Sequence, residues 1–133
     1  MNTMIPVSPG ELVDKITILE IKRKYITIPA KSKLIQTELK QLTAILNGML
    51  KVSERKRPAV LIEKKMLKAI NKKLWDIENR IRAKEAKQSF DKEFIELARL
   101  VYLTNDKRSE IKNRINILFG SAIKEIKQYS KYK

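Results

Sequence analysis

Hydrophobic and polar positions along the chain follow the repeat of amphipathic helices, and the first helix carries a clear start signal. Ser8 is followed by Pro9 and, three positions after the serine, by Glu11, which is the arrangement of a capping box with proline in the first helical turn. We expect this helix to span residues 9–25. Its apolar positions form two stripes, made by Leu12, Ile16, Leu19, Ile18, Ile21 and Tyr25. A helix that is apolar on two sides packs against more than one neighbour, so the charged residues between the stripes are expected to be only partly solvated.

Three further apolar repeats predict three more helices, over residues 29–49, 58–87 and 92–119. Proline stands at the start of the first two of them, and an Asn-Gly pair at 47–48 suggests where the first of the three ends. The 58–87 helix keeps the heptad spacing of a coiled-coil seam. The basic residues 51–57 are expected to form a connection.

The last two predicted helices are separated only by a short turn at residues 89–91, so we expect them to form a long antiparallel hairpin. The sequence therefore predicts an all-α fold, an antiparallel helical bundle of four main helices in a single domain over residues 1–133. Residues 120–133 are expected to form a short terminal helix or a frayed basic tail.

Polar side chains occupy positions of the last long helix where apolar residues are expected. Projected at about 100° per residue, Asn105, Arg108 and Lys112 point to the same side as the apolar Ile115. An arginine is rarely buried without a partner, so other helices must compensate these charges. The candidate partners from the first and third helices are Glu11, Asp14, Lys15, Asn71, Trp75, Glu78 and Arg82.

Three interpretations of these polar residues stay open. In the first, they form an internal network of ion pairs and hydrogen bonds that fixes the helix register. In the second, a cleft between helices uses its arginines and lysines to hold an anionic ligand or an acidic segment of a partner protein, and Asn71, Asn105 and Trp75 orient it. In the third, the helix phase is shifted by two residues and the polar groups lie on the surface.

The chain is strongly basic, with 30 Lys and Arg against 15 Asp and Glu and a formal net charge of +15. Such a charge suggests a polyanionic partner, although an A/T-rich genome would produce the same excess of lysine. The basic residues are concentrated in residues 51–73, where no aromatic residue is interleaved. Salt-dependent nucleic-acid binding through this surface is therefore an alternative function. Its candidate residues, on the face opposite the apolar seam, are Lys64, Lys65, Lys68 and Lys72.

The absence of two residue types excludes several kinds of catalysis. The chain has no His and no Cys, which excludes zinc sites with these ligands, thiol catalysis, disulfides and imidazole acid–base chemistry. A second alternative is a small all-α enzyme that acts on a carboxylate or phosphate substrate, using Glu78 or Glu85 with Arg108. We expect no metal site and no cofactor. No apolar run is long enough to span a membrane and no secretory signal is evident, so we expect a cytoplasmic protein without a membrane partner.

Three segments of the chain resemble a family of small, uncharacterised bacterial proteins, a domain of unknown function. They are IPVSPGELVDKITILEIK (5–22), LWDIENRIR (74–82) and FIELARLVYLTNDKR (94–108). The resemblance covers nearly the whole chain and implies no assigned activity. The residues that fall in its motifs are Ser8, Glu11, Asp14, Lys15, Glu20, Lys22, Trp75, Asp76, Glu78, Arg82, Tyr102, Asn105, Asp106 and Arg108.

The polar residues on three helices lead us to expect a small, non-catalytic binding module. Its ligand would be an anionic small molecule or an acidic protein segment, held between the helices. Apolar helix surface left over from the bundle is compatible with a homodimer.

Overall fold

The computed structural model of the chain describes residues 1–126 and 130–131. Within these residues it contains four α-helices and a short 3-10 helix, and no strand. The elements are α1 (Pro9–Tyr25), α2 (Pro29–Val52), η1 (Glu54–Lys56), α3 (Arg57–Ala86) and α4 (Lys92–Leu118). The predicted all-α fold is confirmed. None of the described helices has the length and apolar character needed to cross a membrane.

α1 has the bounds that its start signal and apolar stripes predict. Ser8 Oγ accepts a hydrogen bond from the backbone N–H of Glu11 at 3.1 Å, and Pro9 occupies the first helical position. The Glu11 carboxylate, which a capping box would turn back to the backbone, accepts a hydrogen bond from Lys112 of α4 instead. The start of α1 is therefore tied both to its own cap and to the last helix.

α2 runs three residues beyond its predicted end at Met49, so the stop expected at Gly48 is wrong. Leu46 and Leu50, on either side of that glycine, are buried in the core. Their burial outweighs the cost of about 1 kcal/mol that a glycine brings to a helix interior. The predicted connection over 51–57 is correspondingly reduced to Ser53 and η1.

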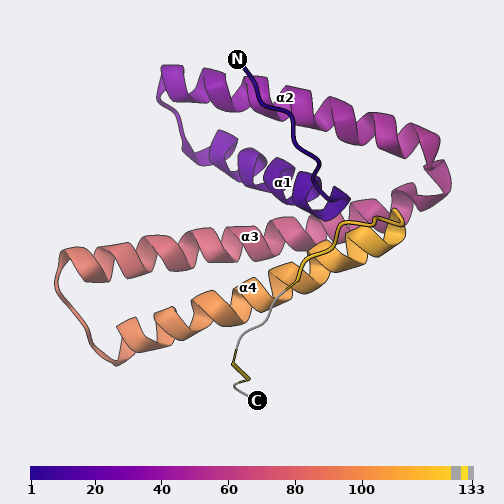
Figure 1. Ribbon diagram of the computed structural model, residues 1–133. Helices are drawn as coiled ribbons and strands as arrows, with labels where there is room; N and C mark the ends of the chain where they lie inside the picture. The colour runs from indigo at the N-terminus through magenta and orange to yellow at the C-terminus, as the bar shows by residue number, and fades with distance from the viewer. Residues whose placement is uncertain (127–129, 132–133) are drawn as a thin grey trace.

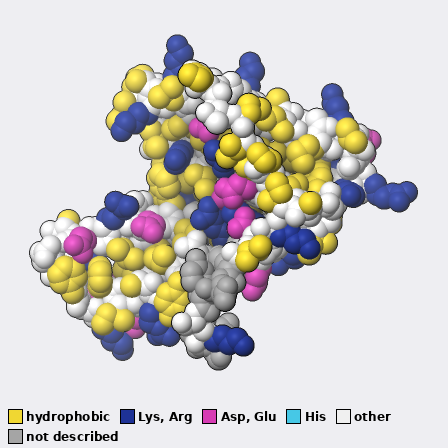
Figure 2. Space-filling view, viewed as in Figure 1, with side chains coloured by type: hydrophobic (Ala, Val, Ile, Leu, Met, Phe, Trp, Pro, Cys, Tyr) yellow, Lys and Arg dark blue, Asp and Glu magenta, His cyan; other side chains and the backbone are white. Residues whose placement is uncertain are grey.

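α1 lies at the centre of the bundle, between α2 on one side and the α3–α4 hairpin on the other (Figure 1). α3 and α4 pack closely as the predicted antiparallel hairpin. The buried apolar core is made by Leu12, Val13, Ile16, Leu19, Ile35, Leu39, Leu46, Leu50, Val60, Leu67, Ile111 and Ile115. Because α1 has neighbours on two sides, its polar residues are carried into the interior as well. On the face shown in Figure 2, acidic and basic side chains gather between the two helix pairs.

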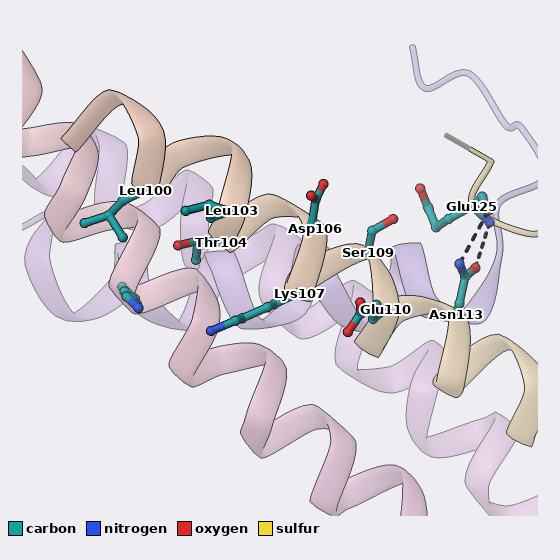
Figure 3. A pocket seen from close by; sticks show the side chains of 10 residues that line it. Leu100, Leu103, Thr104, Asp106, Lys107, Ser109, Glu110, Asn113 and Glu125 are labelled. Atoms are coloured by element: carbon teal, nitrogen blue, oxygen red, sulfur yellow. Dashed lines mark hydrogen bonds between the residues drawn. The ribbon is translucent and has the colours of Figure 1, made fainter. Parts of the chain in front are cut away.

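After α4 the chain turns back along that helix. Gly120 has a φ of 64°, the left-handed conformation that commonly follows a helix end. Residues 121–126 are not helical. The Asn113 side chain holds them by accepting a hydrogen bond from the backbone N–H of Glu125 at 3.0 Å and donating one to its carbonyl at 3.4 Å (Figure 3). The terminal helix expected over 120–133 is therefore wrong for residues 121–126; the rest of that segment lies partly outside the described residues and stays a prediction.

Candidate functional site

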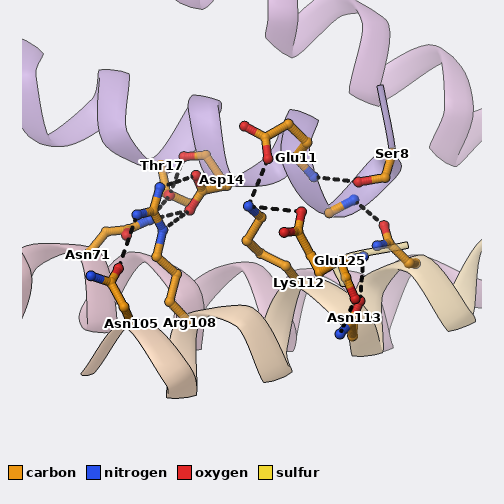
Figure 4. Close-up of polar contacts among 12 residues, drawn as sticks. Ser8, Glu11, Asp14, Thr17, Asn71, Asn105, Arg108, Lys112, Asn113 and Glu125 are labelled. Carbon is orange, nitrogen blue, oxygen red and sulfur yellow. Dashed lines mark hydrogen bonds and ion pairs between the residues drawn. The ribbon is translucent and has the colours of Figure 1, made fainter. Parts of the chain in front are cut away.

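Polar side chains from α1, α3, α4 and the tail meet in one layer inside the bundle, which we call the polar layer (Figure 4). Its members are Glu11, Asp14, Thr17, Asn71, Asn105, Arg108, Lys112, Asn116 and Glu125. Lys112 is only 8% exposed, and the Arg108 side chain is 28% exposed. The two cations therefore lie inside the bundle, as the helical projection predicts, and the interpretation with a shifted helix phase is wrong.

Asp14 is the centre of the first half of the polar layer. It is 1% exposed, and its Oδ1 accepts hydrogen bonds from Arg108 Nε at 2.8 Å and Asn71 Nδ2 at 2.9 Å. Arg108 Nη2 donates a second bond to Asp14 Oδ2. Asn71 Nδ2 also lies 2.9 Å from Thr17 Oγ1, which donates to the Asp14 carbonyl. Asp14 raises the pKa of Arg108, against the opposing effect of burial, so the guanidinium stays charged and fully compensated.

Lys112 is the centre of the second half. Its Nζ donates to Glu11 Oε2 at 2.7 Å and lies 3.0 Å from Glu125 Oε1. Burial by itself lowers the pKa of Lys112, but the hydrogen bonds to Glu11 and Glu125 outweigh it, so the pKa is raised above its usual value. In the whole layer, three carboxylates therefore face two cations.

We expect the contribution of Lys112 to stability to disappear in alkali. Because its pKa is raised in the folded state, the paired ammonium stabilises the fold fully below the ordinary lysine value of 10.5, and this is lost as the pH rises through the folded pKa. Lys112→Met should lower the free energy of unfolding by about 1 kcal/mol near neutral pH, because the Glu11 and Glu125 carboxylates left behind are partly exposed to water. In thermal melts the difference in stability between the two proteins should stay constant up to pH 10.5 and narrow only above it.

The matched control for this titration is Lys33→Met, which removes an exposed lysine of α2. The difference in stability between this variant and the parent protein should be small, and it should not narrow over the same pH range. If the melting temperature of Lys112→Met followed that of the parent protein at a constant difference up to the highest pH, Lys112 would not stabilise the fold as a charged group.

The start of α1 approaches α4 very closely. The backbone N–H of Gly10 donates to Asn116 Oδ1 at 2.7 Å. A Cβ at Gly10 would lie 2.4 Å from the carbonyl oxygen of Lys112 and 2.8 Å from Asn116 Oδ1. Only glycine fits at this crossing without a shift of the helices. The close crossing in turn keeps Glu11 and Asp14 within reach of α4.

Four of the predicted ligand residues lie outside the polar layer. Lys15 is exposed and faces Glu38 of α2, with Nζ and Oε1 3.6 Å apart. Arg82 and Glu78 are exposed and face each other at 3.9 Å on α3. Trp75 packs against Tyr25 instead. The structure thus brings together six of the ten, namely Glu11, Asp14, Asn71, Asn105, Arg108 and Lys112.

A different group of cations surrounds a hollow between α1 and α3, which we call the lysine groove. It encloses about 320 Å³. Its lining residues are Glu20, Ile21, Lys24, Tyr25, Lys65, Lys68, Ala69 and Lys72. Four lysines and one glutamate therefore line it, and Lys72 has a further carboxylate partner in Asp76, whose Oδ1 is 2.6 Å from its Nζ.

Glu20 lies against this groove and holds two lysines of α3. Its Oε1 lies 3.4 Å from Lys64 Nζ and 3.8 Å from Lys68 Nζ, and its side chain is 17% exposed. The same oxygen is buried and accepts no hydrogen bond from the residues that the structure describes. The Glu20 carboxylate thus keeps two ammonium groups at the edge of the lysine groove, although one of its oxygens lacks a hydrogen bond.

The lysines predicted for nucleic-acid binding lie along the border between α3 and α1. Lys64 and Lys68 approach Glu20 of α1, and Lys72 Nζ lies 4.7 Å from the centre of the Tyr25 ring. They border α1, where Lys65 and Lys68 are exposed and Lys64 and Lys72 are half-buried. The 51–73 stretch contains no aromatic residue, but Tyr25 supplies one from α1, and sequence reasoning missed it because the pairing is tertiary.

A second hollow lies along α4 and is unsuited to an anion. It encloses about 710 Å³. Figure 3 shows its carboxylates, from Asp106, Glu110 and Glu125, beside Lys107, and Lys73 of α3 completes the charged lining. Lys112 already pairs with Glu125, so the remaining charged lining is two carboxylates and two ammonium groups, without the positive excess that would attract an anion.

The residues named for an enzyme are not assembled. Glu78 and Glu85 are both exposed on α3, and the Arg108 guanidinium is bound to Asp14. Within the described part of the chain, no group of three or more acidic side chains could hold a metal ion.

Comparison with known proteins gives one match. The sequence model of a protein family described as a family of unknown function (DUF6165) matches residues 3–132. No curated protein and no solved structure matches the chain.

Proposed function

Since the chain belongs to the DUF6165 family, whose description assigns no function, we propose from the geometry alone that it is a small binding module that takes an anionic ligand in the lysine groove. One observation carries the proposal. Lys24 from α1 and Lys65, Lys68 and Lys72 from α3 line a hollow whose lining includes one acidic residue, Glu20. Lys72 is paired with Asp76, which leaves Lys24 and Lys65 without a carboxylate partner among the described residues. A hollow with such a charge excess attracts anions and concentrates them near its surface.

The polar layer is the weaker candidate for the same function. Arg108 already has the Asp14 carboxylate, and Lys112 already has two carboxylates. An incoming anion would have to displace these buried partners, which costs more than binding at an open lysine. We therefore assign the polar layer to holding the helices together and the lysine groove to binding.

The proposal keeps part of both functions expected from the sequence. It retains a non-catalytic module with an anionic ligand, and it retains Lys65, Lys68 and Lys72 as binding residues. A cytoplasmic location, a bacterial origin, a homodimer and a single independent domain remain expectations from the sequence.

We expect the full-length protein to bind a labelled single-stranded oligonucleotide or inorganic polyphosphate with an affinity that falls steeply with salt. For single strands, the logarithm of the binding constant falls by about 0.7 per phosphate contact for each tenfold rise in salt. The variant Lys65→Gln/Lys68→Gln should bind more weakly and show a salt slope shallower by about 1.4. Fluorescence anisotropy from about 50 mM salt upward measures both quantities.

Two variants control for charge alone. Lys87→Gln/Lys92→Gln removes the same charge from exposed residues near the turn between α3 and α4, and it should keep the parent slope. Glu20→Gln removes the carboxylate beside the groove and should tighten binding. Loss of binding that is equal in the two lysine variants, or no binding of either polyanion at low salt, would overturn the proposal.

A further inference from the structure

An aromatic pair lies beside the lysines of the groove. Tyr25, in the last turn of α1, stacks on Trp75 of α3, with ring centroids 6.0 Å apart and an interplanar angle of 26°. Tyr25 is 44% exposed, and Trp75 is half-buried. Trp75 supports the tyrosine ring from one side, so the tyrosine is a pre-formed aromatic surface rather than a mobile side chain.

The tyrosine ring is also within reach of the cations. Lys72 Nζ lies 4.7 Å and Lys24 Nζ 5.5 Å from its centroid. Lys72 is held in addition by Asp76, whose Oδ1 lies 2.6 Å from the same Nζ. Cation–π contacts of this kind keep the ammonium groups close to the ring. A base that stacks on this ring takes the place of these ammonium groups on its face, and an aromatic surface and positive charge then meet the ligand in one hollow.

We propose that the lysine groove recognises a nucleotide unit, with its base on the Tyr25 ring and its phosphate among Lys24, Lys65 and Lys68. This inference rests on the proposed function and names its ligand class. Aromatic rings beside a basic groove bind bases of nucleotides or single strands by stacking, and they do so with little sequence preference because every base has a π-face. A duplex does not fit, because its bases are stacked within the helix and cannot reach the ring.

Trp75 gives a direct readout, because it is the only tryptophan of the chain. A single-stranded oligothymidylate should quench its fluorescence and bind about tenfold more tightly than inorganic polyphosphate of the same charge. Tyr25→Leu should remove most of this tenfold preference, measured as the ratio of the two affinities for the same variant. Tyr25→Phe should keep it, because the ring remains. Tyr102→Leu, which removes an exposed tyrosine of α4, is the matched control.

The arms of the experiment distinguish the ligand sources. If thymidine monophosphate competes as well as the single strand at equal nucleotide concentration, the ligand is a free nucleotide. If only the strand competes, the ligand is single-stranded nucleic acid. Equal affinities for oligothymidylate, polyphosphate and polyglutamate, unaffected by Tyr25→Leu, would overturn the inference and leave the proposed function standing. Tighter binding of a duplex of the same length would overturn it too. Binding to none of these probes would remove both proposals.

Discussion

Replacing Asp14 by asparagine should lower the free energy of unfolding by about 3 kcal/mol, although no atom is lost from the core. The carboxylate is 1% exposed and accepts three hydrogen bonds, two from Arg108 and one from Asn71. An amide at this position turns an N–H toward at least one of these donors. It also leaves a half-buried guanidinium without its counterion, which is the expensive way to break such a pair. Urea unfolding followed by circular dichroism measures the change.

Glu78→Gln is the matched control for the loss of one carboxylate. Its partner Arg82 is exposed, with 3.9 Å between the charged atoms, so we expect a change below about 0.5 kcal/mol. Combining Asp14→Asn with Arg108→Met should cost less than the sum of the two single changes, because the buried charge is removed together with its partner. If Asp14→Asn were as mild as Glu78→Gln, the polar layer would not hold the helices together.

The helices that begin with strong local signals were the most predictable part of the fold. α1 begins at the predicted residue because a serine cap and a proline fix its start within one turn. α2 ends later than predicted because Gly48 is a local signal, whereas the burial of Leu46 and Leu50 depends on α1 and α3. A helix end that is decided by packing cannot be found from propensity alone.

The burial of the polar residues was predictable, and so were some of their partners, but not all. The apolar positions around Arg108 and Lys112 showed that both would lie inside, and Asp14 was among the candidate partners. Glu125 was missed because it lies in a non-helical segment, for which apolar periodicity gives no position. Trp75 was assigned to the wrong group, because one helix face does not reveal whether its neighbour supplies a carboxylate or Tyr25.

Gly10→Ala should destabilise the protein by about 3 kcal/mol, although the substitution adds only a methyl group to an α-helix. The added Cβ would lie 2.4 Å from the Lys112 carbonyl oxygen and 2.8 Å from Asn116 Oδ1. The first of these atoms belongs to the backbone of α4, so a rotamer change cannot relieve the contact, and α1 must move away. That movement lengthens the 2.7 Å hydrogen bond from Gly10 to Asn116 and pulls Glu11 away from Lys112. Thermal melts should show a midpoint lower by roughly 10 °C.

Gly48→Ala should have the opposite effect on the stability of the same chain. Gly48 lies inside α2, and an added Cβ there would meet no atom within 4 Å. The change should therefore stabilise the protein by about 1 kcal/mol, through helix propensity alone. If the two glycine-to-alanine substitutions change the stability in opposite directions, the loss in Gly10→Ala comes from the crossing of α1 and α4. If Gly10→Ala also stabilised the protein, the two helices could not pass as closely as this crossing requires, and the contact of α1 with the cations of α4 would fail with it.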